Sequence, residues 1–203
     1  SGYHDSENSV IGFSHTHLSG TGCGDLFDVT LMPVMGEVEY GRGRLGDYST
    51  GFWSEADRTQ EVVEPGYCSV PLTRYNILAE MTATERGALH RYTFPEGEDA
   101  AIILDLVHGG CFDRPEDLYA EAVSDTRVVG RRHSWGWSSN QKVYFAIEFS
   151  KPFTEFEPIG EYGFYYRIHF ETTAGEQIGV KVALSSTSPE GAELNFNAEV
   201  ANA

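Results

Sequence analysis

The sequence predicts an all-β protein, built as a large antiparallel β-sandwich of two sheets. Three observations lead to this fold class: strand-like segments recur along the chain, turn-forming residues separate them, and helical periodicity is almost absent. The 203 residues are enough for about a dozen strands in one domain, so both sheets are expected to be sizeable. An up-and-down or jelly-roll barrel is the alternative, because it is made from similar strands.

The expected strands can be followed in order along the chain. Residues 28–34 (DVTLMPV) alternate in part between apolar and polar side chains, and residues 67–94 indicate a meander of three strands. Residues 100–109 (AAIILDLVHG) form a nearly continuous apolar run, which is typical of a strand buried on both faces. The series is completed by the β-prone segments VYFAIEFS, YGFYYRIHFET and IGVKVALSST, at residues 143–150, 162–172 and 178–187.

Two segments have helix-like features. Residues 114–123 (RPEDLYAEAV) could form two helical turns. The segment SPEGAELNFNAEV has a better start signal, with Ser188 as the N-cap, Pro189 at the first helical position and a glutamate in the first turn. We therefore expect a sandwich domain over residues 1–187, followed at residues 188–203 by the start of a linker helix.

The charge balance argues against some classes of partner. The chain has 14 Lys and Arg against 31 Asp and Glu, a net charge of −17. A surface this acidic repels the phosphates of nucleic acids and anionic membranes. No apolar run approaches the roughly 18 residues that a membrane span needs. The three cysteines, Cys23, Cys68 and Cys111, lack CxxC spacing, so at most one disulfide can form and free thiols are the alternative.

The motif GFSHTHLSGTGCGD, at residues 12–25, is the first candidate site. In a strand, His15 and His17 would stand side by side on one face, as a pair of zinc ligands can. Zinc needs further ligands, which Cys23 or Asp25 could supply only if the glycines fold the chain back. A Cys23 nucleophile beside a histidine base and an ordinary wide turn are the alternatives. The glycines also allow a ligand or another backbone to approach closely.

Three tryptophans are candidates for stacking on a sugar ring, since ligand sites favour aromatic walls. Trp135 and Trp137 are two residues apart and share a face if the segment is extended. Trp53 lies in a polar stretch between strand signals, which suggests an exposed ring. Packing in the core is the alternative for Trp135 and Trp137, and a loop tucked under its own ring is the alternative for Trp53. A glycosidase also needs two carboxyl groups flanking the scissile bond, and linear spacing singles out no such pair here.

Several separated motifs, taken together, resemble one known family. They are IGFSHTHLSGTGCGD, PGYCSV, ILAEMTATERGALHRYTFP, GWSSNQKVYFAIEFSKPF and VALSSTSPEGAELN, in that order. They look like the amino-terminal domain of glycoside hydrolase family 92, the calcium-dependent exo-acting α-mannosidases. The resemblance covers about residues 1–195, nearly the whole chain.

The resemblance implies a fold, a reaction and a missing partner domain. The fold is a large supersandwich of the galactose-mutarotase-like kind, which is followed in this family by a carboxy-terminal (α/α) toroid. The enzymes remove terminal α-linked mannose from glycans with inversion, using a carboxylic acid and a carboxylate that activates water. The catalytic groups and the calcium ligands lie in the toroid. No catalytic or metal-binding residue is therefore expected in this chain, which alone should be inactive.

The resemblance also assigns residues to the substrate pocket or to the domain interface. They belong to the opening motif and are His15, His17, Ser19, Gly22, Cys23 and Asp25. The expected location is secreted, periplasmic or at the cell surface, although no signal peptide is visible in this chain. A stand-alone carbohydrate-binding or interaction domain is the competing hypothesis. The mannosidic linkage stays open, because this loop carries glycines and Cys23 in place of a bulky aromatic residue.

Overall fold

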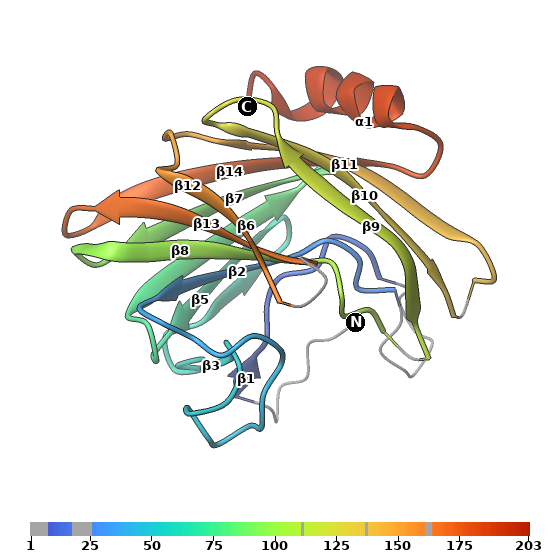
Figure 1. Ribbon diagram of the computed structural model, residues 1–203. Coiled ribbons are helices and arrows are strands. Elements are labelled where there is room, and N and C mark those ends of the chain that lie inside the picture. Colours follow the sequence, from blue (N-terminus) through green and yellow to red (C-terminus); the bar gives the residue numbers. More distant parts are fainter. Residues whose placement is uncertain (1–7, 18–25, 111, 137, 161–163) are drawn as a thin grey trace.

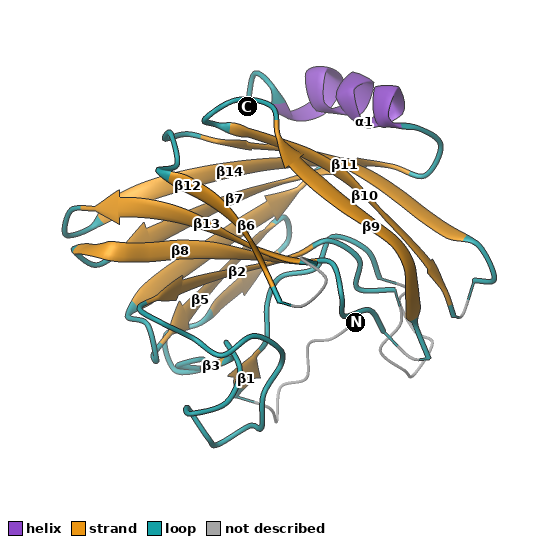
Figure 2. Ribbon diagram, viewed as in Figure 1, coloured by secondary structure: helices purple, strands orange, loops and turns teal. Residues whose placement is uncertain are grey.

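The computed structural model describes residues 8–17, 26–110, 112–136, 138–160 and 164–203. Its two main antiparallel sheets face each other, with a short helix on the outside of the larger one (Figure 1). Figure 2 shows that strands account for most of the regular structure. The predicted two-sheet β-sandwich is confirmed.

The larger sheet has eight strands, in the order β4-β5-β6-β7-β14-β11-β10-β9. The predicted meander forms three consecutive strands of it, so this part of the sequence prediction is confirmed. The strands are β4 (Val62–Glu64), β5 (Tyr67–Leu72), β6 (Ile77–Ala83), β7 (Gly87–Phe94), β9 (Arg114–Ala122), β10 (Arg127–Trp135), β11 (Gln141–Phe149) and β14 (Glu176–Ser185).

The smaller sheet has four strands, in the order β12-β13-β8-β2, and a separate pair joins β1 to β3. The apolar run predicted as a doubly buried strand is β8, and its residues from Ala100 to Leu104 have no exposed surface. The bounds are β12 (Glu155–Ile159), β13 (Tyr165–Thr172), β8 (Gly97–Asp105), β2 (Thr30–Met35), β1 (Ser9–Val10) and β3 (Ser54–Glu55).

The core lies between the two sheets and follows the alternation of each strand. In β7, for example, His90, Tyr92 and Phe94 are buried. Leu89, which comes directly before His90, instead packs with the cluster on the outer face. This period of two places one row of side chains in the core and leaves the other row for the surface or the helix.

The predicted helix is present at the end of the chain. Helix α1 (Pro189–Asn195) begins at the N-cap Ser188, whose hydroxyl accepts a hydrogen bond from the amide of Gly191 at 3.1 Å. It continues into the π-helical turn η1 (Phe196–Val200), and the two lie over the outer face of β14 and β11 (Figure 1). Phe196 and Val200 pack there against small alanines of the sheet.

The prediction of helical turns at residues 114–123 is wrong, because this segment is the edge strand β9. Its pattern has a period of two: Leu118 and Ala120 turn inward, and Tyr119 between them is exposed. Eight of its residues pair with β10, and that tertiary pairing outweighs the local helix propensity. Pro115 is tolerated because an edge strand has one side free of ladder hydrogen bonds.

Candidate functional site

The histidine motif runs along the edge of the four-stranded sheet. Residues 12–17, which we call the strap, lie beside the chain that leads into β2. Phe13 and Leu31 exchange two backbone hydrogen bonds, of 2.8 and 3.1 Å, and the amide of Phe27 donates to the carbonyl of Thr16 at 3.0 Å. The two segments that flank residues 18–25 are therefore held side by side.

The segment that follows residue 25 has an unusual backbone conformation. Leu26, Phe27 and Val29 have positive φ angles of 65°, 55° and 54°. Positive φ is uncommon for any residue other than glycine, and a β-branched valine there is a genuine outlier. Such a conformation costs about 1–3 kcal/mol per residue and persists only where surrounding contacts enforce it.

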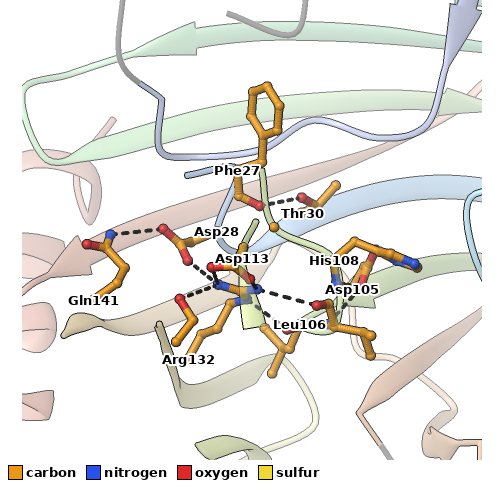
Figure 3. A network of polar contacts seen from close by, with 12 residues as sticks. Phe27, Asp28, Thr30, Asp105, Leu106, His108, Asp113, Arg132 and Gln141 are labelled. Carbon is orange, nitrogen blue, oxygen red and sulfur yellow. Dashed lines mark hydrogen bonds and ion pairs between the residues drawn. The ribbon is translucent and has the colours of Figure 1, made fainter. Parts of the chain in front are cut away.

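A buried arginine, Arg132, contacts Asp28 within this segment (Figure 3). Arg132 has no exposed surface, and one of its terminal nitrogens donates to Asp28 at 2.5 Å. The other terminal nitrogen pairs with Asp113, and Nε donates to the carbonyl of Leu106 at 2.8 Å. Burial alone would lower the pKa of Arg132, but the two carboxylates outweigh it and raise the pKa. The guanidinium therefore stays charged.

Asp28 connects this arginine to the strap. Its Oδ2 accepts a hydrogen bond from the Thr16 hydroxyl at 2.8 Å and another from the side-chain amide of Gln141 at 3.1 Å. The Thr16 hydroxyl oxygen also accepts from the Asp28 amide at 2.8 Å. Asp28 is fully buried, and these bonds satisfy a charge that would otherwise be costly. The network thus ties the strap to β10 and β11.

The same network holds the loop that follows β8. The amide of Gly110 donates to the carbonyl of Leu26 at 2.8 Å, and Arg42 donates to the carbonyl of Gly109 at 3.0 Å. Asp105, at the end of β8, accepts from the amide of His108 at 3.0 Å (Figure 3). The loop after β8 and the strained segment before β2 therefore form one hydrogen-bonded unit.

On its other side the strap is attached to β7. The Nδ1 atom of His15 is bonded to the carbonyl of Val29, and its Nε2 lies 3.0 Å from Nε2 of His90. The Nδ1 of His90 is bonded to the Tyr92 hydroxyl at 2.8 Å. Burial lowers the pKa of His15 to about 4, although the bond to Val29 opposes the shift. Burial and the nearby His15 also lower the pKa of His90.

The strap forms part of the wall of an open pocket of about 1150 Å³. Strap residues line it together with Phe27, the inner residue His90, Gln141 at the start of β11, and Ser185 at the end of β14. The pocket therefore lies where the predicted motif meets the ends of the eight-stranded sheet. Its size suits a ligand of several rings.

The predicted site residues are distributed unevenly around this pocket. His15 and His17 both line it, but His15 is half-buried with both nitrogens bonded, whereas His17 is exposed. The loop residues of the prediction lie outside the described residues: they are Ser19, Gly22, Cys23 and Asp25. The structure shows how the segments on either side of residues 18–25 are held together. The roles of the four residues themselves stay predictions.

The prediction that Trp53 is exposed for sugar stacking is wrong. Its side chain is 1% exposed, Nε1 donates to the carbonyl of Asp47 at 3.3 Å, and the Tyr48 ring lies 4.9 Å away between centroids. The polar loop around Trp53 packs against the ring, as the alternative of a loop tucked under its own tryptophan predicted. Trp135 is 44% exposed beside Arg114, so stacking there stays a prediction. Trp137 lies outside the described residues.

The buried Trp53 and the exposed Trp135 should differ in how much stability a substitution costs. Replacing Trp53 by phenylalanine removes a buried hydrogen bond and part of a packed ring, and should lower the free energy of unfolding by about 1–2 kcal/mol. The same change at Trp135 should stay within about 0.5 kcal/mol. Urea unfolding followed by circular dichroism measures both, and equal losses would contradict the burial of Trp53.

The described residues do not support the metal alternative. Within them, no group of three or more His, Cys, Asp or Glu side chains is placed to hold a metal ion. His15 has no nitrogen left for a zinc ion, because one contacts a carbonyl and the other contacts His90. Cys68 is a half-buried free thiol whose pKa is raised by burial. Cys23 and Cys111 lie outside the described residues, so their state stays open.

The sequence alone did not identify the residues that hold the strap and the segment before β2 in place. They are Asp28, Arg132, Asp113 and Gln141, together with His90 and Tyr92 on β7. No motif connects them, because Asp28 and Arg132 are 104 positions apart and His15 and His90 are 75 apart. One signal was available in the segment GRRHSW. Arg132 alternates with residues that face the core, and a buried arginine needs an acidic or carbonyl partner inside the protein.

Comparison with known proteins now adds to this geometry. The α-mannosidase BT3965 of Bacteroides thetaiotaomicron, from family GH92, is 30% identical in sequence with a TM-score of 0.89, and the match covers 98% of this chain and 29% of that one. The inverting mannosidase BT2199 of the same species is 25% identical with a TM-score of 0.66, over 86% of this chain and 24% of that one. An uncharacterized secreted glycosidase of Arthroderma benhamiae is 30% identical over 118 residues, which are 52% of this chain and 14% of that protein.

The sandwich and these matches define the class of protein: this chain is a β-sandwich domain related to those of glycoside hydrolases. More narrowly, it belongs to the glycosyl hydrolase family 92 N-terminal domain, which matches residues 1–185. The resemblance found in the sequence is thereby confirmed. The chain spans less than a third of the length of the two mannosidase structures.

Proposed function

We propose that this chain is the non-catalytic sandwich portion of a calcium-dependent, inverting exo-α-mannosidase that removes terminal α-linked mannose from glycans. The observation that supports this most is the strap, which carries the family's motif and lines a large pocket. The related enzyme BT3965 is an α-mannosidase that also has a structure in complex with mannoimidazole. A mannose-containing glycan is therefore the substrate we assign.

In this proposal the sandwich forms one wall of the substrate pocket and the interface with a carboxy-terminal (α/α) toroid. The helix that starts after Ser188 begins the linker to that domain. By the family resemblance, the toroid would supply the carboxylic acid, the carboxylate and the calcium ligands. The sandwich would orient the mannose and exclude water from one side.

We also propose a secreted, periplasmic or cell-surface location. The support is the name of the Arthroderma relative, a secreted glycosidase. No helix in the described part of the chain is long and apolar enough to cross a membrane. The acidic net charge of −17 is compatible with neutral glycans and unfavourable for nucleic acids.

A stand-alone carbohydrate-binding domain is the second candidate, and the exposed Trp135 favours it. The two functions differ in what the isolated chain does. A binding domain should hold mannosides by itself, and substituting Trp135 by alanine should abolish that binding. A pocket wall should bind a mono-mannoside only weakly, because most of the contacts would come from the other domain. Calorimetric titration of the chain with methyl α-mannoside distinguishes them.

The test of the enzyme proposal compares this chain with the full product of its gene. We expect 4-nitrophenyl α-mannoside to be hydrolysed by the full product and not by residues 1–203 alone. In the full product, Thr16→Val should lower kcat/KM by about ten- to a hundredfold, because it loosens the pocket wall. Thr154→Val, which removes one bond to the carbonyl of His169, is the matched control and should change little. Turnover by the isolated chain would overturn the proposal.

A further inference from the structure

The chain of contacts from Tyr92 through His90 and His15 to Val29 has a single arrangement of its protons. His90 is 6% exposed, Tyr92 is fully buried, and the Phe13 ring packs against both, with centroids 6.4 and 6.3 Å away. No acidic side chain is bonded to either histidine within the described residues. Both imidazoles are therefore neutral at pH 7, and each has one N–H donor and one acceptor nitrogen.

The carbonyl of Val29 determines the direction of the chain. A carbonyl oxygen only accepts, so Nδ1 of His15 carries the proton that is shared with it. Nε2 of His15 is then an acceptor, and Nε2 of His90, 3.0 Å away, must be the donor. Nδ1 of His90 is in turn an acceptor, and it receives the hydroxyl proton of Tyr92 at 2.8 Å. The two histidines thus have opposite tautomers.

We propose that His90 and Tyr92 are positioning residues that hold the ring of His15 in place, in the tautomer that the Val29 carbonyl requires, and with it the pocket wall formed by the strap. This inference rests on the proposed function only in taking that wall as the edge of a sugar pocket. The chain of bonds joins the strap to β7 across the interior, while Thr16 joins it to β10 and β11 through Asp28.

Under this proposal His15 shapes the pocket wall and does not bind a ligand through its nitrogens. With both nitrogens bonded inside the protein, the ring has no donor or acceptor left for a sugar hydroxyl, a metal or a thiol. What it offers to the pocket is a rigid carbon surface, which suits the apolar C–H groups of a pyranose ring. His17 is exposed on the same pocket, so it is the member of the pair that we expect to make polar contacts with a ligand.

Nitrogen NMR of the chain with ¹⁵N-labelled histidine tests the proton arrangement directly. We expect His15 to be protonated at Nδ1 and His90 at Nε2, with a scalar coupling between the two Nε2 nuclei across the hydrogen bond. His17, the exposed neighbour, should show averaged shifts and serves as the internal reference. A proton on Nε2 of His15, or the absence of the coupling at pH 7, would overturn the inference.

Two substitutions at His90 separate positioning from packing. His90→Gln keeps an N–H donor near the position of Nε2 and should preserve the His15 shifts, whereas His90→Leu fills the space without a donor and should change them. For Tyr92→Phe the matched control is Tyr75→Phe, which removes a buried hydroxyl bonded to the carbonyl of Phe52 at 3.0 Å. Only Tyr92→Phe should shift the His90 resonances. Equal spectra for His90→Gln and His90→Leu would contradict the proposal.

Activity of the full gene product gives a separate readout. His90→Leu should lower kcat/KM by at least tenfold and His90→Gln by less than threefold, at a pH where both remain folded. Similar losses for the two variants would contradict the positioning role. If the full product has no mannosidase activity, the proposed function fails, but the NMR result on the proton arrangement still stands or falls independently.

Discussion

Replacing Arg132 by methionine is expected to lower the free energy of unfolding by about 3–5 kcal/mol. Methionine has a similar length, but it leaves Asp28 without the cation that offsets its burial, and it removes the main partner of Asp113. It also leaves the carbonyl of Leu106 without its donor. Arg132→Lys should recover only part of the loss, because an ammonium cannot span two carboxylates and the carbonyl at once.

The neighbouring residue provides a matched control. Arg131 points to the opposite face of β10, where it pairs with Asp117 with its side chain 37% exposed. Arg131→Met should therefore cost no more than about 1 kcal/mol. Adding Asp28→Asn and Asp113→Asn to Arg132→Met should restore part of the stability, because the uncompensated charges are gone. Urea unfolding of the four variants measures these differences, and equal losses at positions 131 and 132 would refute the buried network.

Acidification should destabilise the protein before its carboxylates titrate. The pKa of His15 is about 4 in the folded chain against 6.5 when unfolded. Between these values the unfolded state binds a proton that the folded state rejects, so stability falls as the pH falls from 6.5 towards 4. A shift of this size corresponds to about 3 kcal/mol at most. His90, whose pKa is also lowered, acts in the same direction.

Removal of the histidine tests this assignment. His15→Leu should flatten the dependence of stability on pH between 6.5 and 4.5, although the variant is less stable at pH 7. Tyr75→Phe is the control, because it removes a buried hydrogen bond to the carbonyl of Phe52 but no group that ionises between pH 4.5 and 6.5, so it should leave the slope in place. The paired carboxylates Glu80 and Asp117 have lowered pKa values, so their stabilisation is lost at lower pH. A slope as steep in His15→Leu as in the unchanged chain would rule out the assignment.

Much of the fold could be predicted because its signals are local. The apolar run at residues 100–109 predicted the buried strand β8, and the cap at Ser188 predicted helix α1. Each depends only on side chains within a few positions, where a period of two or a single hydroxyl determines the outcome. Residues 114–123 misled the prediction, since a short segment can satisfy either period and its pairing with β10 decides.

The candidate site could be predicted only as a motif. The family resemblance pointed to residues 12–25, and the structure places the strap on the wall of the pocket. The prediction for Trp53 failed because a polar sequence around a tryptophan does not show which way the loop folds over it. Burial of that ring depends on Arg74, which donates to the carbonyls of Trp53, Gly51 and Tyr48 from 20 or more positions away.

The sequence by itself determined the fold class, the family and the position of the motif, because strand periodicity and motif order are properties of neighbouring residues. Only the tertiary structure decided what the described residues of the motif contact. The partner of His15 on β7 is His90, and the partners of Asp28, which holds Thr16, are Arg132 on β10 and Gln141 on β11. These strands come far along the chain, and strand register brings their side chains within hydrogen-bond distance. That register turns a histidine, which in sequence resembles a metal ligand, into a residue with both nitrogens satisfied inside the protein.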